Sequence, residues 1–101
     1  MKLELTGKQR AFLRSMANDY ETIFQIGKDG ISDETVHQVG NALEARELIK
    51  LRVLDMCPHT SREASEIIAE RANAAVVSVV GSRFVLYRPS KTKKEKIRLP
   101  K

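Results

Sequence analysis

The residues best suited to chemistry in this sequence are glycines and cations, gathered in one short loop and at the two ends of the chain. Gly27-Lys28-Asp29-Gly30 lies between an apolar, β-like run and an amphipathic, helix-like run. Glycines in such a loop permit positive φ angles and a close approach of another backbone. The free N–H groups at the start of the following helix attract phosphate. The loop therefore suits contact with a phosphate backbone, although a plain strand-to-helix turn explains the same residues.

Positive charge is concentrated at both ends of the 101-residue chain, whose formal net charge is +5. Residues 1–14 carry +3, residues 15–82 carry −5 and residues 83–101 carry +7. Such segregation favours a polyanionic partner, because each phosphate that is neutralised releases counterions. A tail that only keeps the protein soluble is the alternative.

Further cations lie on the expected strands. Lys50 and Arg52 alternate with apolar residues, so both point to one face of their strand, and Arg83 and Arg88 flank the last apolar run. An ordinary solvated face explains the first pair equally well, and protection of an edge strand by charge explains the second. Tyr87 can stack on a base, but packing is the commoner use of an aromatic residue in a strand.

Residues for catalysis or metal binding form no recognisable set. Cys57-Pro58-His59 lacks a second ligand cluster at the spacing of a zinc finger, and His37 is expected on a helix surface. No Ser/His/Asp order or carboxylate pair stands out. We therefore predict a protein that is not an enzyme and that uses no metal or cofactor.

The elements that must position the loop and the cations follow from apolar periodicity and from capping signals. Helices are predicted to begin at the caps Thr6, Ser32 and Thr60 and to end near residues 17, 46 and 73. Strands are predicted over residues 22–26, 48–54, 75–80 and 83–88. In the first helix, Phe12, Leu13 and Met16 form an apolar seam with a basic flank. Gly81-Ser82 suits a type II′ hairpin turn.

The order α-β-α-β-α-β-β predicts an α/β fold, with one mixed four-stranded sheet and helices packed against it. We expect a domain over residues 1–90 and a basic tail over residues 91–101 that is extended or disordered when unbound. Cys57 has no partner for an intrachain disulfide, and no apolar run suits a signal peptide or a membrane span. We therefore expect a cytoplasmic protein.

Four segments resemble the YhbY-like RNA-binding family, the bacterial stand-alone form of the CRM (chloroplast RNA splicing and ribosome maturation) domain. They are LTGKQRAFLRSMA, IGKDGIS, ALEARELIKLRV and VVGSRFVLYRPS, in the family's order over nearly the whole chain. The resemblance implies a fold similar to the C-terminal domain of translation initiation factor three, and association with precursors of the large ribosomal subunit. It places the RNA-binding loop on residues 27–30, with basic support from Lys8, Lys50 and Arg88. Arg46 stands where many bacterial members carry a histidine, so the resemblance assigns no role to Arg46.

These observations predict a monomeric RNA-binding protein that acts in assembly of the large ribosomal subunit, with rRNA or a pre-50S particle as partner and no membrane. Because aromatic residues are few, recognition of RNA shape is favoured over a base code. A DNA-coating protein and a protein–protein adaptor are the alternatives. The predicted RNA contacts are Gly27, Lys28, Asp29, Gly30, Lys8, Arg10, Arg14, Lys50, Arg52, Arg83, Arg88, Lys91, Lys93 and Lys94.

Overall fold

A computed structural model of the protein describes residues 4–100 and shows the predicted elements in the predicted order. The helices are α1 (Gly7–Ala17), α2 (Asp33–Arg46) and α3 (Ser61–Ala72). The strands are β1 (Thr22–Ile26), β2 (Leu48–Val53), β3 (Ala75–Val80) and β4 (Arg83–Tyr87). The sheet has the order β1-β2-β4-β3, with β1 parallel to β2 and the other neighbours antiparallel. The predicted α/β fold with a mixed four-stranded sheet is therefore confirmed.

Local signals set the ends of the elements. Thr6, Ser32 and Thr60 each accept a hydrogen bond from the backbone N–H three residues on, and each forms a capping box. Gly81 has a φ of +59° whereas Ser82 has no positive φ, which fits a type II′ turn rather than type I′. Strands β2 and β4 and helix α3 each end one residue before the predicted boundary.

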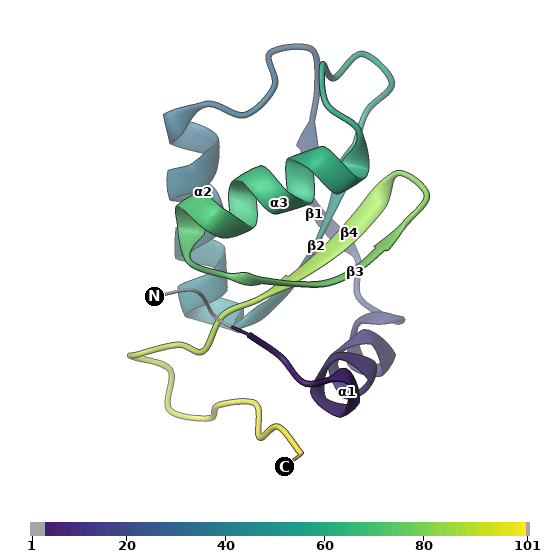
Figure 1. Cartoon of the computed structure of the whole chain (residues 1–101). Coiled ribbons are helices and arrows are strands. Elements are labelled where there is room, and N and C mark those ends of the chain that lie inside the picture. The colour runs from purple at the N-terminus through teal and green to yellow at the C-terminus, as the bar shows by residue number, and fades with distance from the viewer. Residues whose placement is uncertain (1–3, 101) are drawn as a thin grey trace.

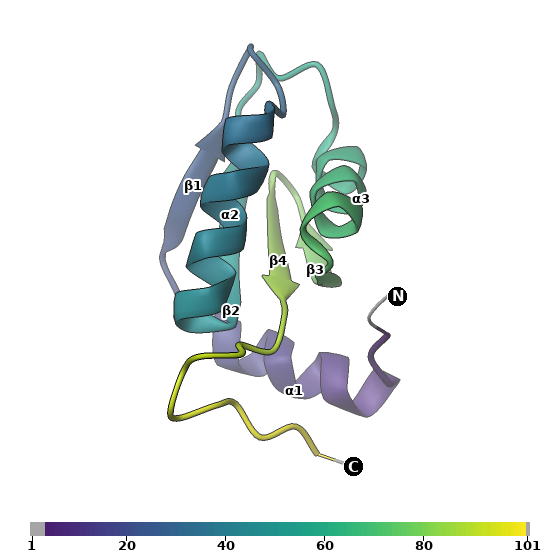
Figure 2. The same ribbon diagram turned by 90° about the vertical axis from the view of Figure 1, so that its left-hand side faces the viewer.

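The sheet separates two apolar cores. Helices α2 and α3 cover one face, and α1 lies across one end of the opposite face (Figure 1, Figure 2). Ile49, Leu51 and Phe84 point into the larger core beneath α2 and α3. Leu13 of α1 packs with Leu48 and with the outer residues of β3 and β4. No helix within residues 4–100 is long and apolar enough to cross a bilayer.

The seam of α1 differs from the predicted one. Leu13 and Ala17 are buried and Met16 packs beside them, but Phe12 is 39% exposed. A helix that crosses only one end of a sheet buries a narrow stripe, so a residue one position off that stripe faces solvent.

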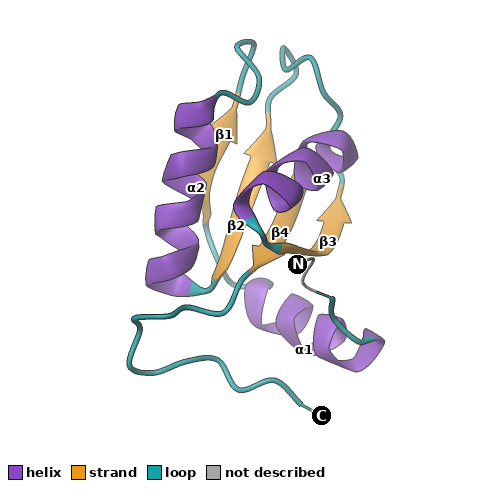
Figure 3. Ribbon diagram, turned by 60° about the vertical axis from the view of Figure 1, so that its left-hand side comes forward, coloured by secondary structure: helices purple, strands orange, loops and turns teal. Residues whose placement is uncertain are grey.

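The C-terminal tail lies against the domain. As predicted, it has no helix or strand; it passes the lower end of α2, turns back and continues below α1 (Figure 3). Ile97 and Leu99 nevertheless pack against the smaller core, and Gln9 Nε2 donates a hydrogen bond to the Pro100 carbonyl at 3.1 Å. Two apolar residues of the tail, Ile97 and Leu99, therefore have a packing role that the sequence did not reveal.

Replacing Gly40 with alanine should raise the free energy of unfolding by about 0.5–1 kcal/mol, because glycine inside a helix costs backbone entropy. The position has room for the methyl group, since an added Cβ lies 3.9 Å from Arg88 Nη1, an ordinary contact. Urea denaturation followed by circular dichroism measures the change.

Gly30 provides the contrasting control. Its φ is +68°, and an added Cβ lies 3.2 Å from Pro58 Cγ, so alanine there should destabilise the chain by about 1–2 kcal/mol. If both replacements changed stability in the same direction, the helical geometry at Gly40 or the left-handed geometry at Gly30 would be incorrect.

Candidate nucleic-acid interface

The loop between β1 and α2 is a tight turn that presents one cation. The Gly30 N–H donates to the Gly27 carbonyl at 3.0 Å and closes the turn around Lys28 and Asp29, whose side chains are exposed. Of the four residues of this turn, Gly30 alone adopts a positive φ, so the turn does not require a glycine at position 27. The turn therefore places a lysine at the tip of a rigid, narrow loop that a large ligand can approach closely.

A second loop supports this turn. The connection between β2 and α3 lies beside it at the same end of the sheet (Figure 1, Figure 3). Leu54 N–H donates to the Ile26 carbonyl at 2.9 Å, and the ring of Pro58 closely approaches Gly30. These contacts fix the turn at the carboxyl ends of the two parallel strands, a common place for ligand binding in α/β proteins.

Three cations lie on the sheet face that α2 and α3 leave free. Lys50 and Arg52 alternate with Leu48, which faces α1, so they share that face. Arg83 stands directly opposite Arg52 in the antiparallel pair of β2 and β4, and Arg52 also neighbours Gln25 of β1. Both arginines therefore lie close to the end of the sheet that carries the turn.

These sheet cations are not neutralised within the protein. Among residues 4–100, neither Lys50, Arg52 nor Arg83 forms an ion pair, and Arg52 Nε is buried without a hydrogen-bond partner. Like charges directly opposite each other on neighbouring strands destabilise a sheet. An anionic ligand on this face would relieve that repulsion.

A second group of predicted contacts lies toward the other end of the sheet. Lys8, Arg10 and Arg14 are exposed on α1. Lys91 and Lys94 are exposed on the tail, and Lys93 is partly buried. The fold thus distributes the predicted cations over two regions, one around the turn and the sheet face and the other along α1 and the tail.

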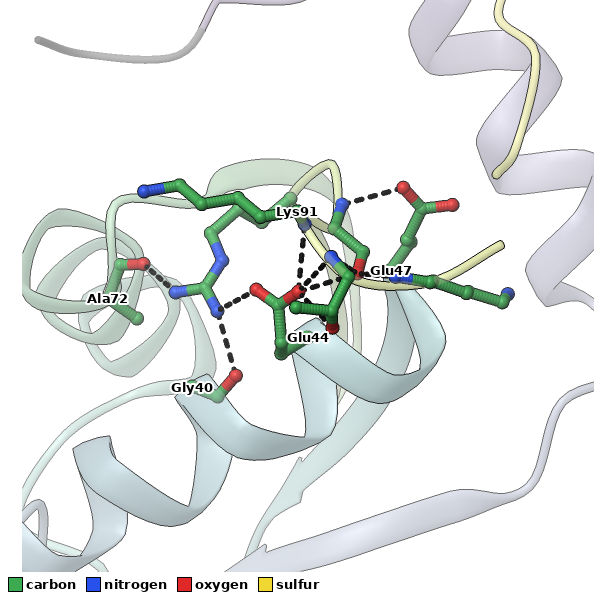
Figure 4. Close-up of polar contacts among 9 residues, drawn as sticks. Gly40, Glu44, Glu47, Ala72 and Lys91 are labelled. Atoms are coloured by element: carbon green, nitrogen blue, oxygen red, sulfur yellow. Dashed lines mark hydrogen bonds and ion pairs between the residues drawn. The ribbon is translucent and has the colours of Figure 1, made fainter. Parts of the chain in front are cut away.

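Arg88 differs from the other predicted contacts, because its guanidinium is occupied by the protein. Nη1 donates to the Ala72 carbonyl and Nη2 to the Gly40 carbonyl, both at 2.8 Å, and Nη2 lies 3.7 Å from Glu44 Oε1 (Figure 4). Ala72 is the last residue of α3, so Arg88 satisfies a carbonyl that the helix leaves free. Arg88 therefore joins α3 to α2.

Two carboxylates hold the start of the tail. Glu44 Oε2 accepts hydrogen bonds from the Ser90 hydroxyl at 2.6 Å, the Lys91 N–H at 2.8 Å and the Thr92 N–H at 2.9 Å (Figure 4). Glu47, which is fully buried, accepts from the Ser90 N–H at 2.7 Å and from the Ile97 N–H at 2.6 Å. The tail is therefore fixed at its beginning and again seven residues later.

Glu47 also makes the turn from α2 into β2. It has a φ of +67°, a conformation that costs energy for any residue except glycine, and it is the single residue between the two elements. Its carbonyl accepts the Arg88 N–H at 2.9 Å. Burial, and after it the Glu47 carboxylate, raise the pKa of Tyr87, which is confirmed as a packed residue with 4% exposure.

Comparison with known proteins identifies the family. The sequence profile of the CRS1 / YhbY (CRM) domain matches residues 5–88. The chain belongs to the CRS1 / YhbY (CRM) domain family. It is 44% identical over 96 residues to the "Probable RNA-binding protein YqeI" of Bacillus subtilis, covering 95% of this chain and 99% of that protein. An "RNA-binding protein" of Haemophilus influenzae is 33% identical over 97 residues, with 96% of each chain covered.

The fold of this CRM domain is also found in a solved relative. The solution structure of the hypothetical protein SAV1595 from Staphylococcus aureus superposes with a TM-score of 0.80 at 43% identity. The superposition covers 96% of this chain and all of the other. The sequence prediction of a CRM-type chain is therefore confirmed, whereas the individual RNA contacts remain predictions.

Acid should weaken the attachment of the tail to the CRM domain. Hydrogen bonds from Ser90 and then from Thr92 lower the pKa of Glu44 from 4.5 to about 2. Because this pKa is lower in the folded state, the stability it contributes is complete above about pH 4.5 and is lost as the pH falls toward 2. We expect the Lys91 and Thr92 amide signals in NMR spectra to move toward random-coil positions over that interval.

The matched control for the acid prediction changes an exposed carboxylate without tail contacts. In Glu44→Gln the Lys91 and Thr92 amide signals should already be displaced at pH 6 and should respond little to acid. In Glu66→Gln the same two signals should move with pH as they do in the unaltered chain. An identical acid response in all three proteins would show that Glu44 does not hold the tail.

Proposed function

We propose that this CRM domain binds rRNA in a precursor of the large ribosomal subunit, through the turn at residues 27–30 and the adjoining sheet face. The observation that supports this proposal is the placement of Arg52 directly opposite Arg83 and beside Lys50, with no ion pair to any of them within residues 4–100. Such repulsion lowers the stability of the sheet, and an anion bound on this face would offset that loss. The relatives named as RNA-binding proteins favour RNA as that anion.

The proposed contacts are mainly to the RNA backbone. Lys28 at the tip of the turn and the three sheet cations form a surface that can follow phosphates, and the cations of α1 and the tail extend it. Phosphate contacts fix position and contribute most of the affinity without reading sequence. Such a protein selects its target through the shape of folded RNA, which suits a ribosomal precursor. It acts as a monomer and without catalysis.

Sedimentation of cell lysate through a sucrose gradient tests the proposed function. The protein, followed by antibody, should migrate with precursors of the large subunit at low salt and should be released by nuclease or by high salt. A protein that stays at the top of every low-salt gradient has no stable ribosomal association. A complex that survives both nuclease and high salt would instead favour the adaptor alternative, since apolar burial resists salt.

Replacing Lys28 with alanine should lower affinity for all RNA sequences by a similar factor. The slope of log K against log salt, which is negative, should become less steep by about one unit, or by less on single strands, because one phosphate contact is lost. Fluorescence anisotropy over a salt series measures both quantities.

Lys28→Arg is the control for the salt prediction, because it keeps the charge at the tip of the turn. Its salt slope should equal that of the unaltered chain. An unchanged slope in Lys28→Ala would remove the tip of the turn from the interface, while the sheet face would still be tested by Arg83 variants.

A further inference from the structure

A cationic hollow lies where α2 meets β2, on the side that faces the tail. It has a volume of about 510 Å³, and its charged side chains are Glu21, Arg46, Lys50 and Lys93. The cations come from the end of α2, the middle of β2 and the tail, so only the folded chain brings them together. Among residues 4–100 none of the three cations forms an ion pair.

The hollow also has the surfaces that a flat aromatic ligand requires. Tyr20 lines it and is 38% exposed, although large aromatic residues are usually covered. Ile23 also lines it and is only partly buried, so it offers apolar surface to a ligand, whereas Leu48 and Ile49 line it but are each 1% exposed. A planar apolar group can therefore enter beside Tyr20 while an attached anion meets the cations at the rim.

Hydrogen bonds fix the backbone at Tyr20 and at Lys93. The Tyr20 N–H donates to the Ala17 carbonyl at 3.0 Å, directly after α1. The Lys93 N–H donates to the Ser90 hydroxyl oxygen at 2.9 Å, and that hydroxyl donates to Glu44 at 2.6 Å. The carboxylate that holds the tail thereby also holds the lysine at the rim of the hollow. The backbone at both residues is therefore ordered before a ligand binds, which lowers the entropic cost of binding.

We propose that this hollow is a nucleotide subsite, in which Tyr20 stacks on an unpaired RNA base while Arg46, Lys50 and Lys93 contact the phosphates beside it. The proposal rests on the proposed function, since RNA supplies the nucleotide. Among the described residues that line the hollow, Glu21 is the one anion, and it can accept a hydrogen bond from an exocyclic amine of the base. A larger hollow of about 990 Å³ beside β3 mixes Glu66 and Glu70 with Arg10 and Arg62, so it lacks this cationic rim.

The subsite changes the expected RNA preference. A phosphate-binding surface alone accepts duplex and single-stranded RNA alike, whereas a stacking residue needs a base that is free of its partner. We therefore expect the chain to select RNA with an unpaired nucleotide next to a helix or in a loop. Stacking is tolerant of base identity, so the preference should be for structure rather than for sequence.

The test compares matched variants on a labelled single-stranded RNA and on a duplex of the same sequence. Tyr20→Leu should bind the single strand about five- to tenfold more weakly, and Tyr20→Phe should bind within about twofold of the unaltered chain, because phenylalanine keeps the ring. Neither should alter duplex affinity. Lys93→Ala should weaken single-strand binding more than Lys94→Ala, since Lys94 carries the same charge on the same tail but does not line the hollow. Circular dichroism confirms that each variant is folded.

Tyrosine fluorescence gives an independent readout, because the chain has two tyrosines and no tryptophan. Tyr87 is buried, so quenching by single-stranded RNA should come from Tyr20 and should vanish in Tyr20→Phe. The subsite would be contradicted if Tyr20→Leu and Tyr20→Phe bound the single strand equally well, or if Tyr20→Leu lost as much affinity for the duplex as for the single strand. Either result would leave RNA binding by the chain unaffected. If the unaltered chain bound neither RNA, the proposed function itself would fail, and the subsite with it.

Discussion

Replacing Phe84 with alanine should lower the free energy of unfolding by about 3–5 kcal/mol, because the change removes buried apolar surface and leaves a cavity. Phe84 is 1% exposed and is the largest of the fully buried side chains. It lies on β4, between β2 and β3, opposite Leu51 and Val79, and it belongs to the core beneath α2 and α3. Small domains are stable by only about 5–15 kcal/mol, so this single change would remove a large part of the total.

Val80→Ala is the matched control for Phe84→Ala. Val80 lies at the end of the neighbouring strand and is 70% exposed, so its truncation should change stability by less than about 0.5 kcal/mol. Urea denaturation followed by far-UV circular dichroism measures both variants. A loss below about 1 kcal/mol for Phe84→Ala would contradict the close packing of β4 against the helical layer.

The helices and strands could be predicted from the sequence because capping residues and apolar alternation are local signals. The caps at Thr6, Ser32 and Thr60 act on a backbone N–H three residues away, and alternation along β2 assigns its cations to one face within six residues. A sequence pattern records such short-range requirements directly. The candidate turn is local in the same sense, since its closing hydrogen bond joins Gly27 and Gly30.

Which cations lie next to one another on the surface could not be predicted in the same way. Arg52 and Arg83 are each visible in the sequence, but their direct opposition depends on β4 rather than β3 pairing with β2. That strand order is set by packing of the whole sheet. The hollow is less local still, because Tyr20, Lys50 and Lys93 come from three distant segments. The repulsion and the hollow, on which both proposals rest, therefore exist only in the folded chain.

The carboxylates at the C-terminal end of α2 and directly after it illustrate the same limit. Glu44 and Glu47 have the composition of an ordinary solvated helix end, yet they bind tail groups 43 to 50 residues away. Nothing in a basic tail indicates which acids will hold its backbone. Backbone N–H groups are present in every residue except proline, so a contact made by them leaves almost no mark on the sequence. The docked course of the tail was therefore missed while its lack of regular structure was predicted.

Replacing Arg88 with methionine should lower the free energy of unfolding by about 1.5–3 kcal/mol, because hydrogen bonds from a charged donor to two carbonyls are lost. The Ala72 carbonyl at the end of α3 then lacks its donor, and Glu44 loses the cation 3.7 Å away. Methionine keeps much of the side-chain volume, so the loss reports the guanidinium rather than a cavity. Arg88→Lys should recover less than half of it, since one ammonium cannot replace a planar fork that joins α2 to α3.

Arg83→Met separates this structural role from RNA binding, because Arg83 is exposed at the start of β4, whereas Arg88 directly follows the end of that strand. Removing the Arg83 guanidinium relieves repulsion with Arg52, so the free energy of unfolding should stay the same or rise slightly. RNA affinity should fall, and the dependence of log K on log salt should become less steep. Arg88→Met should show the reverse when both proteins are compared at a temperature where they are folded. If Arg88→Met were as stable as the unaltered chain but bound RNA weakly, its guanidinium would serve the ligand. The resemblance that places Arg88 in the RNA interface would then describe it better than its contacts with Gly40 and Ala72.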